Sequence, residues 1–389
     1  MKKLSKNINS FVVASLIAAV VCMFFGCGRG IELSRLTVSE PEYLPMFGKT
    51  PARSFFYDMS LGDSLRLKWE TSINGSFDNS APVIMDDCIF IPDLSGRVFA
   101  FNIQDGKKLG EIRHKGVVNN SPVLHKLDLY YVLLQNRRPG SEIKKYNLKM
   151  GEERKELSVK GNILSEAIAA SDGLYYSTET GEILKTDFEL NRLWTFQSGS
   201  MIRSTPALSE NIFVTGTSSG EIIALGSGQG NQIYRKKLDA PFEGGIAIEQ
   251  NRIYAADTKG NLYCLSLNDG QVEWKAELKS KIITTPVLLN DRVVVSSLDG
   301  EVFAIGKTSG RTIWKTVTGG VLNATPAVFR DVVVQPDLNR KLYLMNTETG
   351  KIIKTLVFEE RVRLSPVYYK NILIIGTDRG KVFAYESVR

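Results

Sequence analysis

The stretch of sequence that decides the fold is residues 285–314, which read TPVLLNDRVVVSSLDGEVFAIGKTSGRTIW. Pro286 is followed by Gly300 fourteen residues later, by Gly310 after ten more, and by Trp314 four residues beyond that. Proline has no backbone N–H and fits the start of a strand, while glycine after aspartate supplies the positive φ of a tight hairpin. The runs between these residues are rich in valine, isoleucine and aromatic residues, which favour strands. The segment therefore predicts one sheet of four short antiparallel strands.

The same pattern repeats along the chain. Prolines in a matching context are Pro82, Pro122, Pro206, Pro286, Pro326 and Pro366. Their separations are 40, 84, 80, 40 and 40 residues, so the period is about 40 residues. Each double-length gap is expected to hide one further copy, with its first strand at Ala167 or Ile246, fourteen residues before Gly181 and Gly260. The sequence thus predicts eight copies.

The last copy is incomplete at the C-terminus. It starts at Pro366 and the chain ends nine residues after Gly380, so its fourth strand is missing. Residues 65–69 supply a matching strand, because Trp69 lies thirteen residues before Pro82, where the internal copies place their tryptophan twelve before. Pairing of this strand with the last copy would leave no blade incomplete. We predict an all-β fold, an eight-bladed β-propeller of four-stranded antiparallel blades, closed by an N-terminal strand.

Tryptophans recur on the outermost strand of several copies. Trp194, Trp274 and Trp314 occupy the same repeat position, and Trp69 is their counterpart on the closing strand. A large ring at this place can dock against the neighbouring blade. We predict that these four side chains are structural contacts between blades.

The N-terminal segment is predicted to be an export signal. Lys2, Lys3 and Lys6 precede an apolar stretch at residues 11–25, and Cys27 follows Gly26. A membrane anchor is the alternative, but fifteen residues span only about 22 Å as a helix, less than the roughly 30 Å of a bilayer core. The residues before Cys27 resemble a bacterial lipoprotein box, although Phe25 is bulkier than the residue usual there, and Cys22 is a rival position.

These features divide the chain into three parts. Residues 1–26 are expected to be a lipoprotein signal peptide, residues 27–64 a tether and lead-in, and residues 65–389 the propeller. The resemblance to bacterial lipoproteins implies lipidation of Cys27, and several acyl chains give a lasting anchor. Gly28 after this cysteine favours outer-membrane sorting by the same resemblance. The expected location is the outer membrane, facing the periplasm.

The repeat motifs resemble a known family. The pattern Ser-x-Pro-Val, then Asp-Gly-x-Val-x-Ala, then Gly-Lys-x-x-Trp looks like the PQQ-like repeat, and residues 285–287, 299–304 and 310–314 follow it closely. Residues 44–48, Leu-Pro-Met-Phe-Gly, resemble the short aromatic segment found before the first blade in such proteins. An eight-bladed ring on a lipid anchor also resembles BamB-type lipoproteins, which serve as scaffolds in the machinery that inserts β-barrel proteins into the outer membrane.

Composition excludes several classes of protein. Of the 389 residues, 43% are hydrophobic and 23% are charged, which is too apolar for a disordered chain. Only one apolar run approaches membrane-spanning length, so a multi-span membrane protein is excluded. The net charge of +7 includes the three lysines of the signal, and the other basic residues are scattered, so no nucleic acid partner is expected. The four cysteines and two histidines lack zinc-finger spacing, so no metal site is expected.

The name of the repeat raises the possibility of a quinoprotein dehydrogenase. Such enzymes resemble this fold, but they are longer and carry calcium ligands, a catalytic aspartate and often two adjacent cysteines. This chain has no adjacent cysteines and little room for insertions. The glycine-rich residues 226–230 fall on the turn between the third and fourth strands, with no helix after them to bind phosphate. We therefore expect no catalytic residues and no cofactor.

The remaining histidines and cysteines are assigned structural roles. His114 and His125 lack further ligands at a useful interval and are interpreted as surface or loop residues. Cys88 and Cys264 belong to blades four apart in an eight-membered ring, too far for a disulfide, and are interpreted as small core residues.

Departures from the repeat are the places to look for partner contacts. Blade two carries an insertion at residues 135–141, which contains Arg137 and Arg138, although a tolerated surface insertion is an equal alternative. Asn339 and Arg340 replace a glycine in blade seven. By resemblance to BamB-type proteins, which touch their partner through a loop before an inner strand, the loop with Met201, Ile202 and Arg203 is a candidate contact. Ile282-Ile283 is a competing position.

The leading functional hypothesis is a non-catalytic, lipid-anchored periplasmic scaffold, monomeric within a complex, that contacts an outer-membrane β-barrel assembly protein. The alternative is a PQQ-like propeller lipoprotein that binds another envelope protein or a polysaccharide. A quinoprotein dehydrogenase is the third hypothesis.

Overall fold

The computed structural model describes residues 30–33, 43–136 and 139–388. All secondary-structure elements named in these ranges are β-strands. None of the described residues forms a helix that could cross a membrane. The strands form eight sheets. The predicted all-β class is confirmed.

The first four sheets follow one another along the chain. The first contains β1 (Tyr43–Leu44), β4 (Val83–Met85), β5 (Cys88–Asp93), β6 (Arg97–Asn102) and β7 (Lys108–Arg113). The second contains β8 (Val123–His125), β9 (Asp128–Leu134), β10 (Ser141–Asn147) and β11 (Glu152–Val159). The third contains β12 (Ile168–Ala170), β13 (Gly173–Ser177), β14 (Glu182–Thr186) and β15 (Arg192–Gln197). The fourth contains β16 (Ala207–Ser209), β17 (Ile212–Gly216), β18 (Glu221–Gly226) and β19 (Gln232–Lys237).

The other four sheets include two strands from near the N-terminus. The fifth contains β20 (Ile246–Glu249), β21 (Arg252–Ala256), β22 (Asn261–Ser266) and β23 (Val272–Glu277). The sixth contains β24 (Val287–Leu288), β25 (Arg292–Ser296), β26 (Glu301–Gly306) and β27 (Thr312–Val317). The seventh contains β2 (Phe56–Tyr57), β28 (Ala327–Phe329), β29 (Val332–Pro336), β30 (Lys341–Asn346) and β31 (Ile352–Val357). The eighth contains β32 (Val367–Tyr369), β33 (Ile372–Gly376), β34 (Lys381–Ser387) and β3 (Leu65–Ser72).

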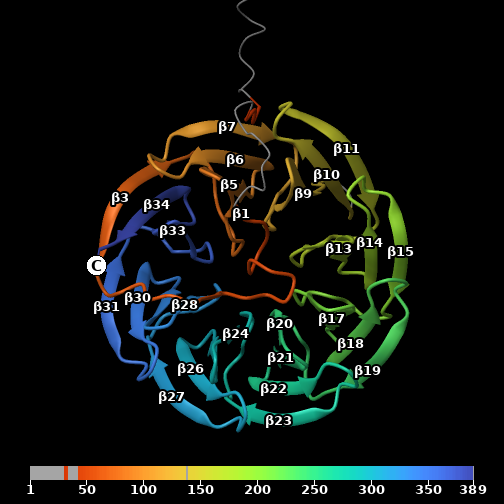
Figure 1. Ribbon diagram of the computed structural model, residues 1–389, viewed down its shortest axis with the longest axis vertical. Helices are drawn as coiled ribbons and strands as arrows, with labels where there is room; N and C mark the ends of the chain where they lie inside the picture. The colour runs from red at the N-terminus through yellow and green to blue at the C-terminus, as the bar shows by residue number, and fades with distance from the viewer. Residues whose placement is uncertain (1–29, 34–42, 137–138, 389) are drawn as a thin grey trace, which may run out of the picture.

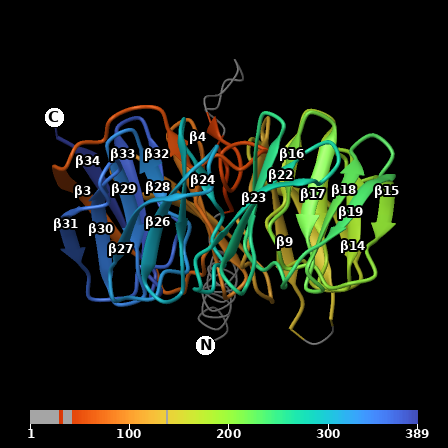
Figure 2. The ribbon, with the colours of Figure 1, turned by 90° about the horizontal axis from the view of Figure 1, so that it is seen from below.

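The sheets are the blades of one propeller. Figure 1 shows them arranged in a ring, with the first strand of each blade near the centre and the last at the rim. Seen from the side, the ring is a short, broad disc (Figure 2). The two copies without a proline form blades three and five, with first strands β12 and β20. The eight-bladed propeller expected from the repeat is confirmed.

The N-terminal strand β3 completes the eighth blade. It pairs antiparallel with β34, with Leu65 opposite Ser387 and Ser72 opposite Lys381. Arg66 and Lys68 of β3 form ion pairs with Glu386 of β34. The chain thus joins its two ends in one sheet, and no blade is left with three strands.

The tryptophans of the outer strands lie between blades. The indole N–H of Trp69 donates to the Ile103 carbonyl of blade one at 2.8 Å, and that of Trp314 donates to the Thr347 carbonyl of blade seven at 2.9 Å. Trp194 and Trp274 make the same bond to the next blade, with the carbonyls of Ser227 and Lys307. We call these four side chains the tryptophan belt.

Residues 43–62 cross the centre of the ring, and we call them the central lead-in. The strand β1 pairs with β4 of blade one, and β2 runs parallel to β28 of blade seven. In between, backbone carbonyls of the lead-in accept N–H groups from blades two, four and five: Pro45 from Leu124, Pro51 from Leu208, and Ala52 from Ile248. Figure 1 shows this segment, in orange-red, passing through the middle of the ring.

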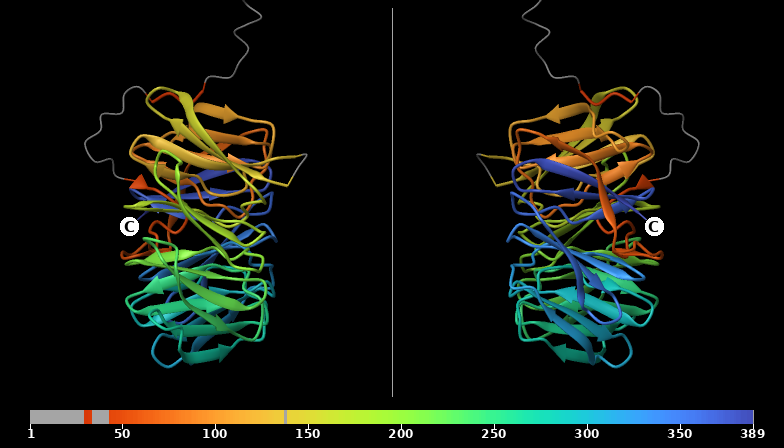
Figure 3. Two further views of the ribbon diagram at one scale, coloured as in Figure 1. Left: turned by 90° about the vertical axis from the view of Figure 1, so that its right-hand side faces the viewer. Right: turned by 90° about the vertical axis from the view of Figure 1, so that its left-hand side faces the viewer.

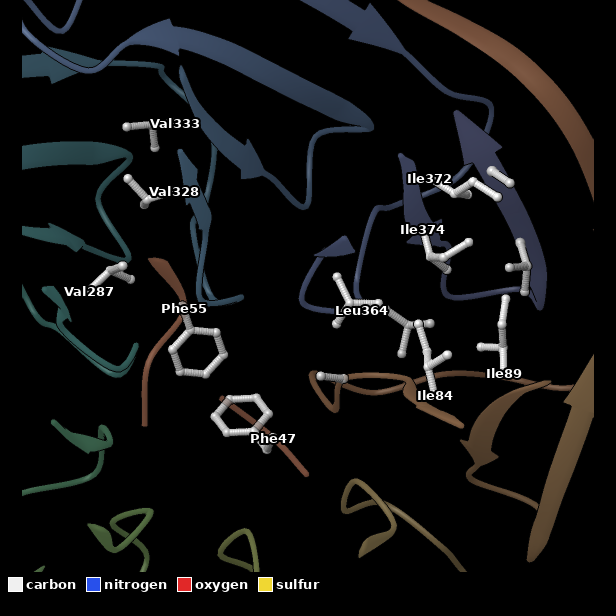
Figure 4. Close-up of a cluster of buried hydrophobic side chains, with 14 of the residues drawn as sticks. Phe47, Phe55, Ile84, Ile89, Val287, Val328, Val333, Leu364, Ile372 and Ile374 are labelled. Atoms are coloured by element: carbon white, nitrogen blue, oxygen red, sulfur yellow. The ribbon is translucent and has the colours of Figure 1, made fainter. Parts of the chain in front are cut away.

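The lead-in lies toward one face of the disc. The side views place it there, whereas the ends of β9 and β10 that adjoin the blade-two insertion lie toward the opposite face (Figure 3). Phe47 and Phe55 of the lead-in stack edge to face at 4.8 Å between ring centres, among residues such as Ile84 and Leu364 of the inner core (Figure 4). The sequence predicts these residues as a lead-in before the propeller. In the structure they fill its centre.

Candidate functional site

A polar cavity lies at the centre of the ring, beside the central lead-in. Its volume is about 570 Å³. All eight blades and the lead-in contribute to its wall, through Phe47, Asp78, Asn79, Ser80, Asn119, Asn120, Leu164, Glu166, Arg203, Thr205, Glu243, Gly245, Ile283, Thr285, Asn323, Thr325 and Ser365. Apart from Phe47, these residues lie within four places before the proline position of each blade, so the same short segment of the repeat forms the wall.

Hydroxyl groups of the residues directly before the proline join neighbouring blades. Ser121 Oγ accepts the N–H of Ala81 at 2.8 Å, and Thr325 Oγ1 accepts the N–H of Thr285 at 3.1 Å. Serine and threonine beside the proline therefore satisfy a backbone N–H of the previous blade. This explains why the repeat carries a small hydroxyl residue here.

Arg53 of the lead-in lies behind the cavity and is fully buried. Its guanidinium donates to four carbonyl groups, those of Phe47 at 2.6 Å, Pro206 at 2.7 Å, Glu166 at 3.0 Å and Ala167 at 2.9 Å. Burial lowers the pKa of Arg53 to about 10, so the group remains a cation at neutral pH. One side chain thereby fastens the lead-in to blades three and four.

Glu166 is the one acidic residue among the side chains directly preceding the proline position. It is 9% exposed, and its Oε2 accepts the backbone N–H of Ser121 at 2.8 Å. Burial raises its pKa from 4.5 to about 7, against the opposing effects of nearby Arg53 and of the Ser121 hydrogen bond. Its carboxyl group is therefore partly protonated at neutral pH.

The other carboxylates of the wall are paired with cations. Asp78 contacts Arg363 at 2.5 Å, and Glu243 contacts Lys281 at 2.7 Å. Arg203 has no ion-pair partner within the described ranges and is exposed. The cavity wall therefore carries little uncompensated charge apart from Arg203 at its rim.

Several oxygens around the cavity have no hydrogen-bond partner among the residues that the structure describes. They are Ser80 Oγ, Asn119 Oδ1, Asn120 Oδ1 and Asn323 Oδ1. Ser80 and Asn120 are only 2% and 3% exposed. Buried polar atoms are normally hydrogen-bonded, so these oxygens are exceptions, and each of them is itself shielded from solvent.

The predicted partner loop has a mixed outcome. Met201 is 49% exposed and Arg203 is exposed, so both side chains are accessible. Ile202 is fully buried in the core beside blades three and four, which rules out a contact through its side chain and corrects that part of the prediction. Its aliphatic side chain belongs to the packing between blades. Ile282, in the competing position, is also fully buried.

The basic insertion of blade two is described only in part. Arg137 and Arg138 lie outside the described residues, as do Cys22 and Cys27 of the signal region. A hollow of about 910 Å³ adjoins the insertion and is lined by His114, Lys115, Gln135, Asn136 and Glu142, among others. Arg340 of blade seven is exposed and has a positive φ of 65°.

The histidines are less exposed than expected. His114 Nε2 lies 2.7 Å from the hydroxyl of Tyr131, and His125 stacks on Phe188 with 3.4 Å between ring centres. Both are half-buried, and burial lowers the pKa of each. His114 lies in the loop after β7, as predicted, whereas His125 is the last residue of β8, and an aromatic ring packs against each.

The free cysteines and the glycine-rich residues 226–230 have the predicted structural roles. Cys88 and Cys264 are both buried and free, as small core residues. Gly226 ends β18 and Gly230, with φ of 71°, lies in the turn before β19, so these glycines form a turn between strands. Within the described ranges, no group of three or more histidine, cysteine, aspartate or glutamate side chains could hold a metal ion.

Sequence reasoning missed Arg53, Glu166 and the cavity itself. A signal for Glu166 was present, because the residue before the proline position is small or hydroxylic in the other seven copies. Arg53 had no such signal, since it lies outside the repeat and is buried only because the lead-in crosses the ring.

One protein family model matches the C-terminal part of the chain. Residues 218–320 and 298–388 match the family described as outer membrane protein assembly factor BamB. No curated protein matches the chain significantly. The resemblance to PQQ-like and BamB-type proteins, predicted from the repeat, is confirmed.

Solved structures share the fold at low sequence identity. The crystal structure of BamB from Moraxella catarrhalis has a TM-score of 0.71 and 17% identity, with 83% of this chain and 100% of that chain covered. The quinohemoprotein alcohol dehydrogenase from Comamonas testosteroni has a TM-score of 0.73 and 11% identity, covering 89% of this chain and 80% of that chain. The computationally designed Ika8 protein gives 0.70 and 16%, with 81% and 98% covered. At such identities these matches show the fold alone.

The cavity wall does not fit a quinone cofactor with a calcium ion. Such a cofactor carries carboxylates that need cations, and calcium needs several free oxygen ligands. Here Asp78 and Glu243 are already paired, and Glu166 is partly protonated. The adjacent cysteines of those enzymes also have no counterpart in this sequence.

Proposed function

We propose that this chain is a non-catalytic scaffold of the BamB type, which supports the insertion of β-barrel proteins into the outer membrane. The observation that carries the proposal is the match of residues 218–320 and 298–388 to the BamB family. The eight-bladed ring, which resembles BamB over the full length of that protein, supports it. We further propose that a lipid on Cys27 holds the ring at the periplasmic side of the outer membrane.

The partner surface that we propose is the loop between β15 and β16, at residues 198–206. Met201 and Arg203 are its exposed side chains, and an accessible thioether beside a guanidinium is typical of interface hot spots. Arg203 also reaches the rim of the central cavity. The insertion with Arg137 and Arg138 is a second proposed contact.

The test is a crosslinking pull-down of the full chain from membranes. We expect the outer-membrane β-barrel assembly protein to be recovered with the wild-type chain, and less of it with Met201→Glu or Arg203→Glu. Met150→Glu is the matched control, because Met150 is exposed on the turn between β10 and β11. Equal recovery by all variants would refute this loop as the contact, and no recovery by the wild type would refute the function.

Two further measurements separate the parts of the proposal. Deletion of the chain is expected to lower the levels of outer-membrane proteins, and unchanged levels would favour a propeller lipoprotein with another envelope partner. Mass spectrometry of the mature N-terminus is expected to show a lipidated Cys27. A retained Met1 or an unmodified Cys27 would refute the anchor while leaving the scaffold role open to the pull-down.

A further inference from the structure

We propose that the central cavity is a binding site for a neutral polyhydroxylated ligand of the size of one or two sugar rings. This site shares only Arg203 and Thr205 with the partner loop, and the inference does not depend on the proposed scaffold function. It is carried by the size and position of the cavity and by the chemistry of its wall.

The cavity has the dimensions of a ligand site. Its volume of about 570 Å³ falls within the range of about 300–1,000 Å³ typical of small-molecule sites. The central lead-in lies against it, with Phe47 in the wall and the buried Arg53 behind. A ligand inside it would therefore be surrounded by blades and bounded on one side by the lead-in.

The wall favours an uncharged ligand. Most of its polar side chains are amides and hydroxyls: Asn79, Ser80, Asn119, Asn120, Thr205, Thr285, Asn323, Thr325 and Ser365. Asp78 and Glu243 are neutralised by Arg363 and Lys281. The cation of Arg53 is occupied by four carbonyl groups, and Arg203 lies at the exposed rim. Apart from Glu166, which is partly protonated at neutral pH and lies near Arg53, an ionic ligand would find no buried counter-charge that is free to pair with it.

Several polar side chains of the wall use only part of their hydrogen-bonding capacity. The Nδ2 group of Asn120 donates to the Ser165 carbonyl at 2.9 Å, and that of Asn323 donates to Asn79 Oδ1 at 2.9 Å. Their Oδ1 atoms, together with Asn119 Oδ1 and Ser80 Oγ, have no partner within the described part of the chain. These four oxygens are shielded from solvent, so the accessible polar groups of the wall are the half-buried amides, such as those of Asn79 and Asn119. The hydroxyl groups of a polyol both donate and accept, so they match amide groups of either kind on one small framework.

Apolar side chains of the cavity wall also suit a sugar ring. Phe47, Leu164 and Ile283 line the same cavity and offer contacts to the C–H groups of a sugar ring. A mixture of apolar wall and convergent polar groups is the usual composition of a small-molecule site. The ligand class that satisfies both parts is a neutral saccharide or polyol.

Calorimetric titration of the full chain, in a detergent without a sugar headgroup, tests the proposal. The neutral probes are glucose, N-acetylglucosamine and maltose, with glucuronate as the anionic probe and spermidine as the cationic probe. We expect at least one neutral sugar to bind with a dissociation constant of about 1 mM or tighter. We expect the two charged probes to bind at least about tenfold more weakly than that sugar.

The Asn119→Trp variant tests whether the sugar binds in the central cavity. Asn119 is half-buried and lines the cavity, and none of its side-chain atoms makes a hydrogen bond within the described residues, so the indole fills space without breaking a bond. We expect binding to weaken at least tenfold. Asn211→Trp, at an exposed turn residue of blade four, is the control and should bind like the wild type. Asn119→Leu, which keeps the volume and removes the amide, is the second variant if the tryptophan disturbs folding.

Each result of the titration either supports or overturns the proposed site. Binding of a neutral sugar that is lost in Asn119→Trp or weakened in Asn119→Leu, and kept in Asn211→Trp, supports the cavity. Absence of binding by all three neutral sugars up to about 10 mM would overturn the proposal. Binding that both Asn119 variants leave unchanged would place the ligand elsewhere, and tighter binding of glucuronate or spermidine would overturn the ligand class.

Discussion

The tryptophan belt and the central lead-in hold the same ring together in opposite ways. The belt uses one contact at equivalent positions, an indole whose N–H reaches a carbonyl of the next blade, as Trp274 does with Lys307. The lead-in uses contacts that occur only once, such as the four hydrogen bonds of Arg53. The belt joins neighbours, whereas the lead-in joins blades that lie far apart around the ring.

The difference has an energetic consequence. In repeat proteins, stability is approximately a sum of similar contacts between neighbours, so the loss of one contact leaves the others in place. The contacts of the lead-in have no duplicate, and its backbone bonds reach blades one, two, four, five and seven. We therefore expect single substitutions in the lead-in to cost more free energy of unfolding than equivalent substitutions in the belt.

The largest expected effect follows replacement of Arg53. Arg53→Ala removes the donors of four buried carbonyl groups and leaves them without partners, which is expected to lower the free energy of unfolding by about 5 kcal/mol or more. Urea unfolding followed by circular dichroism measures this. Arg311→Ala, at an exposed position, is the matched control and should change stability by less than about 0.5 kcal/mol.

Removal of a belt tryptophan tests the other side of the comparison. Trp314 is 8% exposed, whereas Trp194 is half-buried, and both donate to a carbonyl at 2.9 Å. Trp314→Ala should cost about 3–5 kcal/mol, and Trp194→Ala should cost less because less of its ring is buried. Thermal and urea unfolding give both values. If Trp314→Ala proved more costly than Arg53→Ala, the ranking of belt and lead-in would be reversed.

The belt could be predicted from sequence and the lead-in could not, for a physical reason. Repetition exposes structural positions, because the same requirement returns every 40 residues: Trp274 and Trp314 occur at the same distance from the next proline. The lead-in has no second copy to compare with. Its residues were recognised as a segment before the first blade, but their path depends on the width of the closed ring, which no local pattern encodes.

The same reasoning explains the outcome at the candidate site. The eight first strands could be located, so the residues that line the cavity could have been listed in advance. Their burial could not, because Ile202 and Arg203 are adjacent in sequence and one is buried while the other is exposed. The position of each side chain is decided by the neighbouring blade and the lead-in.

Glu166 lies where the lead-in meets the ring, and its ionisation makes the stability of this region depend on pH. Its pKa is about 7 in the folded chain and near 4.5 when unfolded, so between these values the folded state binds more protons. Stability is therefore highest below about pH 4.5, as far as this group is concerned, and falls as pH rises through about 7. The gap corresponds to at most about 3 kcal/mol.

Glu166→Gln removes this titration while keeping an oxygen for the Ser121 N–H. We expect the variant to be more stable than the wild type at pH 8 by about 2 kcal/mol, with a smaller difference at pH 5. Urea unfolding across this range measures both curves. An equal difference at the two pH values would show that the group ionises without cost. Glu301→Gln, in a half-buried ion pair with Lys315, is the control.

The smallest expected effect is the difference between two glycine variants, about 1–2 kcal/mol, which separates close packing in the belt from backbone strain. Gly350 has a φ of 70°, and a Cβ added there would lie 2.5 Å from Cε3 of Trp314. Gly319 has a φ of 75° with nothing within 4 Å of the added atom. Both alanine variants pay the backbone cost of about 1 kcal/mol, but Gly350→Ala must also displace the indole, for a total of about 2–3 kcal/mol. Paired unfolding curves measure the difference. Equal losses would mean that the indole can shift freely, and that the belt is held by the hydrogen bond of Trp314 more than by the fit of its ring.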